Sequence, residues 1–267
     1  MPHHVTAKVR LFGVLAAILP ATIVLTPVQL LAMRFHRPTA RALPVFWHRM
    51  ATRLIGVRVH VRGEPPAGQP LLIVSNHLSW SDIIVLGSVM PLSFIAKREV
   101  RKWPGFNMLA WLQRSVFIDR TRRLDSVNQA NTIARRMADG DAMVLFAEGT
   151  TGDGTRIGPF KSALFGAVHA ALDDGNLDSV TVQPVAIAYT RLHGMPLGRM
   201  HQSYATWPGD VPLVPHLTTF LLNGAYDVEV VFGETSTFSS GVGRKQIAAE
   251  MHERVRASYT QSMRGRA

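Results

Sequence analysis

An uncharged stretch of 23 residues, Leu11–Met33, constrains the fold of this chain more than any other feature. Lysine and arginine residues flank it on both sides. About 20 apolar residues are enough for a helix to cross a bilayer, and the apolar core of a signal peptide is shorter than this stretch. A transit peptide is rich in serine, but the first serine here is Ser75. We therefore expect residues 1–56 to form a membrane-associated segment that is both basic and apolar.

Two prolines leave the depth of this segment open. Pro20 and Pro27 each remove a hydrogen bond from a helix. The stretch is compatible with a kinked helix that spans the bilayer or with a helical hairpin that enters one leaflet, and a buried core helix is a third alternative. Basic residues on both flanks favour a cytoplasmic location of both ends.

The net charge of +11 is concentrated at the two ends of the chain. Residues 1–63 contain nine Lys or Arg and no acidic residue, and residues 244–267 carry +4, whereas the residues between them carry −2. A nucleic-acid enzyme usually concentrates basic residues around its site, so this distribution argues against a nucleic-acid partner. It fits an anionic membrane surface, because each Lys or Arg near the lipid contributes about 1 kcal/mol.

Short apolar runs alternate with helical patterns between residues 57 and 243. The runs predict strands at residues 57–61, 71–74, 94–96, 115–118, 142–146, 180–187 and 228–232. The helical patterns lie at residues 81–90, 126–138 and 160–172. Strands separated by helices predict an α/β fold, in which a mixed, mostly parallel sheet is flanked by helices. We expect residues 57–243 to form one domain of this kind.

The C-terminal residues 244–267 predict a basic amphipathic helix. Its apolar residues Ile247, Met251, Val255 and Tyr259 are four positions apart and share one face. Such a helix can dock on the domain or lie on lipid, and the sequence leaves both arrangements open.

The segment Ser75–Asp82 contains a candidate catalytic pair. His77 and Asp82 would diverge by about 140° on one helix, so they meet only if His77 lies in a loop and Asp82 in the first turn of the next helix. Ser79 is a suitable N-cap for that helix. A carboxylate beside an imidazole fixes its tautomer and stabilises the imidazolium, as a general base requires. From the spacing alone, an Asp82 that only caps a helix and a His77 on the surface are equally compatible.

Cysteine is absent, and no serine lies in a recognised nucleophile motif. A His–Asp pair in this chain therefore has to activate water or a substrate hydroxyl, which favours direct transfer over a covalent intermediate.

Two further segments, Val116–Arg120 and Leu145–Gly154, lie at the ends of predicted strands and contain acidic, basic and glycine residues. Taken singly, an ion pair and a glycine-rich loop explain these two segments equally well.

Four sequence blocks in this order resemble the glycerolipid acyltransferase family, which includes bacterial 1-acylglycerol-3-phosphate acyltransferases. They are NHLSWSD at 76–82, FIDR at 117–120, FAEGT at 146–150 and QPVA at 183–186, with a similar linking stretch at 94–100. The resemblance implies an O-acyltransferase in which His77 deprotonates a lysolipid hydroxyl and Asp82 orients His77. The hydroxyl then attacks the thioester of acyl-CoA or acyl carrier protein. No metal or organic cofactor is expected.

The candidate substrate-binding residues come in part from the resemblance, which implies the third block with Arg120, and in part from the basic residues near that block. The candidates are Lys97, Arg120, Glu148, Gly149, Thr150, Thr151, Arg156 and Lys161. An anionic head group would meet the basic residues, and hydroxyl groups would meet Glu148. We expect the protein at the bacterial inner membrane, with the catalytic domain facing the cytoplasm.

Three departures from the family pattern bear on the acceptor. The second block of the family opens with glycine where this chain has Arg114, and FPEGTR of the third block is changed at Ala147 and Thr151. The missing arginine is the one expected to hold a phosphate. We expect 1-acyl-glycerol-3-phosphate as the acceptor, giving phosphatidic acid in phospholipid biosynthesis, with Arg156 or Lys161 compensating. The alternative is a lyso-ornithine-lipid acyltransferase, which the EGTT variant resembles.

Two alternatives from other functional classes also remain. A membrane-bound lipid hydrolase would use the pair of His77 and Asp82 to activate water. A non-catalytic basic protein that binds membranes or nucleic acid would not depend on His77 at all.

Overall fold

The computed structural model describes residues 2–65, 71–103, 105–118, 123–166, 169, 172, 179–209, 211–239 and 241–265. Within these residues the strands form one nine-stranded sheet in the order β1-β8-β6-β2-β5-β3-β4, with β7 and β9 paired to β6. The strands are β1 (Val57–Arg62), β2 (Leu71–Ser75), β3 (Ser93–Lys97), β4 (Val116–Ile118), β5 (Met143–Phe146), β6 (Ser179–Leu192), β7 (Met195–Pro196), β8 (Tyr226–Phe232) and β9 (Ser236–Ser239).

Strand direction decides which ends of the sequence blocks meet. β2 pairs in parallel with β5 and β6, and β3 pairs in parallel with β5 and β4. β6 runs antiparallel to β7, β8 and β9. The carboxyl ends of β2, β3, β4 and β5 therefore lie at one edge of the sheet, where open α/β sheets usually bind their ligands. The mixed, mostly parallel sheet predicted from the sequence is confirmed.

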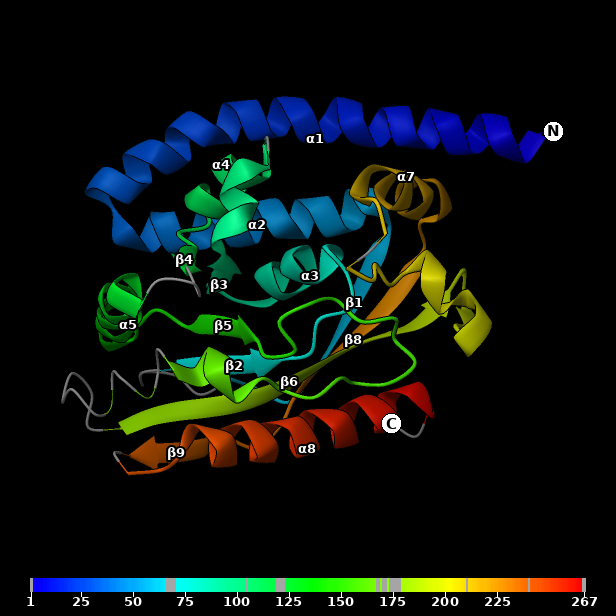
Figure 1. Ribbon diagram of the computed structural model, residues 1–267. Helices are drawn as coiled ribbons and strands as arrows, with labels where there is room; N and C mark the ends of the chain where they lie inside the picture. Colours follow the sequence, from blue (N-terminus) through cyan, green and yellow to red (C-terminus); the bar gives the residue numbers. More distant parts are fainter. Residues whose placement is uncertain are drawn as a thin grey trace.

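Helices cover both faces of this sheet (Figure 1). On one side lie α1, α2, α3 and α7, and α8 lies on the other. The helices are α1 (Pro2–Phe35), α2 (Arg37–Ile55), α3 (Ser81–Val89), α4 (Phe106–Leu112), α5 (Arg123–Ala138), α7 (Leu213–Asn223) and α8 (Arg244–Met263), with short 3-10 helices η1 (Arg98–Lys102), η2 (Ser162–Phe165) and η3 (Arg199–Tyr204).

The apolar N-terminal stretch is one uninterrupted helix, despite its two prolines. The chain turns back after α1 and continues as α2, which packs along α1 (Figure 1). The hairpin is therefore made by α1 with α2, and not within residues 11–33. A buried core helix is wrong for this stretch, because most of its large apolar side chains are exposed. Among the described residues, Lys8–Phe35 is the one helix long and apolar enough to cross a membrane.

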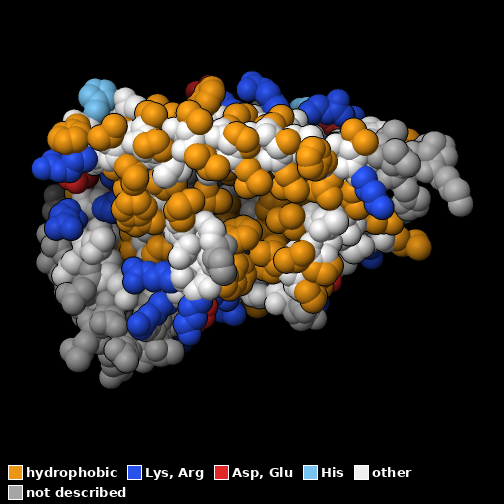
Figure 2. All heavy atoms as spheres, turned by 90° about the horizontal axis from the view of Figure 1, so that it is seen from above, with side chains coloured by type: hydrophobic (Ala, Val, Ile, Leu, Met, Phe, Trp, Pro, Cys, Tyr) orange, Lys and Arg blue, Asp and Glu red, His pale blue; other side chains and the backbone are white. Residues whose placement is uncertain are grey.

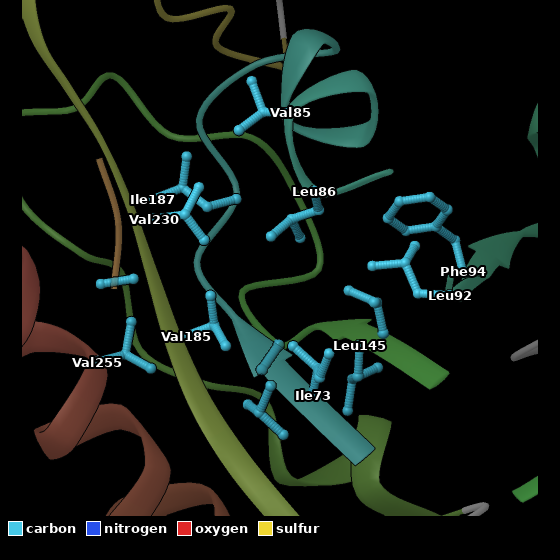
Figure 3. Close-up of a cluster of buried hydrophobic side chains, with 14 of the residues drawn as sticks. Ile73, Val85, Leu86, Leu92, Phe94, Leu145, Val185, Ile187, Val230 and Val255 are labelled. Atoms are coloured by element: carbon cyan, nitrogen blue, oxygen red, sulfur yellow. The ribbon is translucent and has the colours of Figure 1, made fainter. Parts of the chain in front are cut away.

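The core lies between the sheet and its two helical layers (Figure 3). Ile73 of β2 and Val230 of β8 are fully buried, because helices cover both faces of the sheet. Val85 of α3 packs above the sheet and Val255 of α8 packs below it. The C-terminal helix thus docks on the domain through its apolar face, which decides between the two arrangements that the sequence left open.

The secondary structure differs from the sequence prediction at a few places. β6 continues to Leu192, beyond the predicted end at residue 187, because it pairs with four other strands along its length. The helix predicted at 160–172 begins as the 3-10 helix η2, and part of that range lies outside the described residues. The short strands β7 and β9 have no distinct sequence signal.

Arg114 stands where the resembled family has glycine. Its φ of +59° lies in the left-handed region, which glycine adopts without strain. The Arg114 guanidinium donates two hydrogen bonds to the Asp141 carboxylate, at 3.3 and 2.8 Å, and Arg41 and Arg136 each pair with Asp141 at 2.9 Å. Burial would raise the pKa of Asp141, but the three arginines hold it below its usual value. Arg114 therefore serves an ion-pair cluster that joins α2 to the sheet.

Candidate functional site

His77 lies in a loop between β2 and α3. The side chain of the preceding Asn76 fixes this loop to β6, since it donates to the Ile187 carbonyl at 3.0 Å and accepts from the Ile187 N–H at 2.9 Å. Helix α3 begins at Ser81. The break between His77 and the helix, which the five-residue spacing requires, is therefore present.

The imidazole of His77 contacts the carboxylate of Asp82. His77 Nδ1 lies 2.8 Å from Asp82 Oδ2, and the same oxygen accepts the backbone N–H groups of Leu78 at 2.6 Å and Ser79 at 2.9 Å. An ionised carboxylate only accepts hydrogen bonds, so Nδ1 is the donor and the Nε2 lone pair of the neutral ring is left to act as a base. Asp82, in the first turn of α3, thus holds both His77 and the backbone of the loop before the helix, which supports the His–Asp pair and not an Asp82 that only caps the helix.

An aromatic surface fixes the plane of the His77 ring. Phe146, at the end of β5, stacks on it with ring centres 3.9 Å apart, and Phe94 of β3 stacks on Phe146 in turn. The His77 side chain keeps 18% of its surface exposed, whereas Asp82 is fully buried. Nε2 has no hydrogen-bond partner within the described part of the chain. The site therefore presents one accessible basic atom beside an apolar wall.

Glu148 positions the loop of His77. Its Oε1 accepts the backbone N–H of His77 at 2.8 Å and its Oε2 accepts that of Gly158 at 2.7 Å. Burial raises the pKa of Glu148, while these two backbone donors oppose the rise. The Gly152 N–H donates to the His77 carbonyl at 2.8 Å, so the glycine-rich loop and the histidine loop hold each other. Sequence reasoning placed Glu148 against substrate hydroxyls, but both of its oxygens are bonded to the backbone.

The remaining candidate binding residues that the structure describes follow β5 or end β3. Gly149 is in the turn after β5 with a φ of +72°, Thr150 is exposed and Thr151 is buried. Arg156 and Lys161 are exposed beyond that turn. Lys97 is exposed at the end of β3, and Arg120 lies outside the described residues. No group of His, Asp and Glu within the described part of the chain is arranged to hold a metal ion.

Two residues near His77 and Asp82 were not identified from the sequence. Phe146 was assigned only to a strand and a motif, although its ring supports His77. Tyr189 lies three residues beyond the fourth block, and its hydroxyl donates to Asp82 Oδ1 at 2.8 Å. The one available signal was a tyrosine within an otherwise apolar strand, and that signal is weak because tyrosine is common in strands.

Comparison with known proteins identifies relatives over nearly the whole chain. Residues 56–188 match the Acyltransferase family model. The chain is 52% identical over 258 residues to a lyso-ornithine lipid O-acyltransferase of Brucella abortus (strain 2308), covering 97% of each chain. It is 45% identical over 259 residues to a protein of the same name from Rhizobium meliloti (strain 1021), covering 97% of this chain and 88% of that one.

More distant matches carry another acceptor in their names. A 1-acyl-sn-glycerol-3-phosphate acyltransferase of Neisseria gonorrhoeae is 34% identical over 137 residues, covering 51% of this chain and 50% of that protein. The crystal structure of a 1-acyl-sn-glycerophosphate acyltransferase from Thermotoga maritima shares the fold, with a TM-score of 0.62 and 20% identity over 96% of this chain and 97% of that one.

Proposed function

The chain belongs to the acyltransferase family as a lysolipid acyltransferase, and from this premise we propose that its acceptor is lyso-ornithine lipid. The two relatives of 52% and 45% identity, which match 97% of this chain, carry that acceptor in their names. The relative named for an acylglycerol phosphate matches only about half of the chain. The comparisons therefore support lyso-ornithine lipid, the alternative in the sequence analysis, better than the 1-acyl-glycerol-3-phosphate that was expected there.

The third block supports the same acceptor. Thr151, a neutral residue that is 8% exposed, stands where the family pattern has the phosphate-holding arginine. Ornithine presents a carboxylate and an ammonium group instead of a phosphomonoester, so a strong phosphate site is not needed. Arg156 and Lys161 offer positive charge to that carboxylate. Gly149, Thr150, Thr151, Lys97 and Arg120 complete the proposed binding residues.

The proposed reaction uses His77 as the base and Asp82 as its orienting partner. His77 Nε2 removes the proton of the lysolipid hydroxyl while the oxygen attacks the thioester carbonyl of acyl-CoA or acyl carrier protein. The carbon–sulfur bond then breaks, and the thiolate takes the proton from the imidazolium. The Asp82 carboxylate stabilises the imidazolium between these steps. The observation that carries this proposal is the 2.8 Å contact between His77 Nδ1 and Asp82 Oδ2.

A panel of lysolipids tests the acceptor. With one thioester donor and purified protein, we expect kcat/KM for lyso-ornithine lipid to exceed that for lysophosphatidic acid at least about tenfold, because a site without the phosphate-holding arginine forgoes a charge-assisted contact. Diacylated product and free fatty acid are both quantified, so that hydrolysis is detected. The His77→Ala variant measures the background for each acceptor. A preference for lysophosphatidic acid would contradict the proposal.

We propose that the face carrying α1 lies on the membrane. Apolar side chains gather on the face seen in Figure 2, and α1 exposes many of its own. Helices α4 and α7 lie beside α1 (Figure 1), and Trp111 and Val214 on them are exposed. Residues 1–56 then form the membrane-associated segment and residues 57–243 the catalytic domain, against which the helix within residues 244–267 packs. The acceptor is itself a membrane lipid, so this arrangement keeps the site at its source. The expected location is the bacterial inner membrane, with the catalytic domain on the cytoplasmic side.

Charge placed on the α1 face tests the membrane contact. Phe12, Leu19 and Ile23 are 76%, 58% and 72% exposed, so glutamate at all three positions leaves the core intact. Burying each apolar side chain in lipid contributes about 1.5–3 kcal/mol, and we expect the triple variant to sediment with anionic vesicles at least about tenfold less. Met200→Glu, at a 90% exposed position on η3, is the matched control. Equal sedimentation of the triple variant and the control would contradict the assignment.

A further inference from the structure

Tyr189 contacts the catalytic pair from a strand outside the four sequence blocks. It lies in β6, and its side chain is fully buried. Its hydroxyl donates to Asp82 Oδ1 at 2.8 Å and lies 2.6 Å from Ser81 Oγ. Asp82 therefore has one oxygen bonded to His77 and two backbone N–H groups, and the other bonded to Tyr189.

The carboxylate of Asp82 fixes the direction of the hydrogen bonds that connect Ser81, Tyr189 and Asp82. Asp82 only accepts, so the single proton of the Tyr189 hydroxyl points at Oδ1. Ser81 Oγ must then donate to the tyrosine oxygen, which strengthens the bond to Asp82. Burial, with the nearby Asp82 charge, raises the pKa of Tyr189 well above its ordinary value, so the hydroxyl remains a donor over the working range of pH.

The strand holds Tyr189 at a fixed distance from the histidine loop. Asn76 joins that loop to the backbone of Ile187, two residues before Tyr189. The pairing of β6 with β8 shifts register between Tyr189 and Arg191, directly after Tyr189. The ring also meets Phe220 of α7 edge-on, with centres 6.5 Å apart. The hydroxyl is thus preorganised by backbone pairing and by packing.

We propose that Tyr189 is a positioning residue of the acyl transfer, which acts on His77 through Asp82. Its hydroxyl completes the set of donors around the buried carboxylate and fixes the rotation of that group, so that Oδ2 stays aligned with His77 Nδ1. It also withdraws negative charge from the carboxylate, which limits how strongly His77 holds a proton. This inference rests on the proposed role of His77 as the base.

The test compares Tyr189→Phe with Tyr226→Phe. Tyr226 is equally buried, contacts the same Phe220, and donates its hydroxyl to the backbone carbonyl of Tyr204 at 2.9 Å. For Tyr189→Phe we expect kcat to fall about 10- to 100-fold, as for a lost hydrogen bond to a charged group, with KM changed less than about twofold. We expect Tyr226→Phe to keep kcat within about twofold, whatever its melting temperature.

The pH profile separates positioning from mere packing. In Tyr189→Phe, Asp82 loses a donor and attracts the His77 proton more strongly, so the acid limb of kcat/KM should move to higher pH by at least about half a pH unit. Another acidic side chain near His77 is Glu148, which accepts the backbone N–H of His77. Neither tyrosine variant changes this contact. An unmoved limb, or equal kcat losses in both tyrosine variants, would overturn the proposal.

A double-mutant cycle tests whether Tyr189 acts through Asp82. In an Asp82→Asn background, Tyr189→Phe should change the residual rate less than about twofold, and an undiminished effect would overturn the proposal. If Tyr189→Phe does not fold, Ser81→Ala keeps the tyrosine ring and removes only the donor to its hydroxyl. We expect kcat to fall about two- to fivefold there, with the limb moved in the same direction. If the acid limb of kcat/KM does not move in Ser81→Ala, the positioning role of Tyr189 is overturned.

The outcomes distinguish this inference from the proposed function. If His77→Ala stays active, the assignment of the base fails, and the role of Tyr189 fails with it. If activity depends on His77 but Tyr189→Phe behaves like Tyr226→Phe, only the role of Tyr189 is overturned.

Discussion

We expect replacement of His77 with alanine to lower kcat at least about 100-fold, the low end for loss of a general base. The reason is geometric, because Nε2 is the basic atom that the ring leaves free while Nδ1 is held by Asp82. The side chain is 18% exposed and stacks on Phe146 through one face, so its removal leaves the core largely in place. Initial rates with a thioester donor and a lysolipid acceptor measure the loss.

His60→Ala is the matched control for that experiment. His60 Nε2 lies 2.9 Å from Asp227 Oδ1, so it also forms a His–Asp pair, but it lies on β1 with a 55% exposed side chain. We expect its activity to stay within about twofold of the unaltered protein. A loss of less than about tenfold for His77→Ala, with an intact melting transition, would rule out His77 as the base.

Asp82→Asn is expected to lower kcat about 10²- to 10⁴-fold while the protein still folds. The amide oxygen can accept the N–H groups of Leu78 and Ser79, as Oδ2 does now, and the amide nitrogen can face the Tyr189 hydroxyl oxygen. The start of α3 is therefore kept. What is lost is the negative charge that stabilises the imidazolium, so the defect should appear in kcat with little change in KM.

Asp227→Asn controls for the loss of a buried carboxylate. Asp227 is 7% exposed and pairs with Arg58 and His60, at 2.9 Å each. We expect this substitution to lower the melting temperature without a comparable loss of kcat. If Asp82→Asn melts normally and retains more than about a tenth of the activity, the carboxylate charge is not part of the catalysis.

The sequence predicted the elements that build the sheet better than it predicted their limits. Leu71–Val74 and Ala142–Phe146 are short, continuously apolar runs, and such runs are strands only if both faces are covered, as they are in β2 and β5. β6 was predicted to end at residue 187, because the polar and bulky residues that follow break the apolar pattern. Pairing with β7 and β8 extends it to Leu192, and that pairing has no local signal.

The candidate site also contains some contacts that the sequence predicted and others that it did not. The spacing of His77 and Asp82 allowed their contact and the family resemblance implied it, because loop and helix geometry act over only a few residues, whereas the predicted N-cap Ser79 was wrong, since Trp80 stands at the N-cap of α3. Glu148 was assigned to the right region, but its contacts with backbone amides were not predicted, since these amides belong to a loop 71 residues earlier and to Gly158. The ring of Phe146 and the hydroxyl of Tyr189 reach the pair only because β5 and β6 flank β2 in the sheet.

By itself, the sequence determined the apolar helix near the N-terminus, the alternation of strands and helices, and the loop-to-helix spacing that lets an imidazole meet a carboxylate five residues later. Each of these depends on hydrophobic periodicity or on local geometry, which act between near neighbours. Tertiary structure alone decided that α2 folds back along α1, that α8 docks on the sheet, and that Tyr189 meets Asp82. These contacts join residues far apart in the chain, where strand order and burial, not local preference, decide which side chains touch.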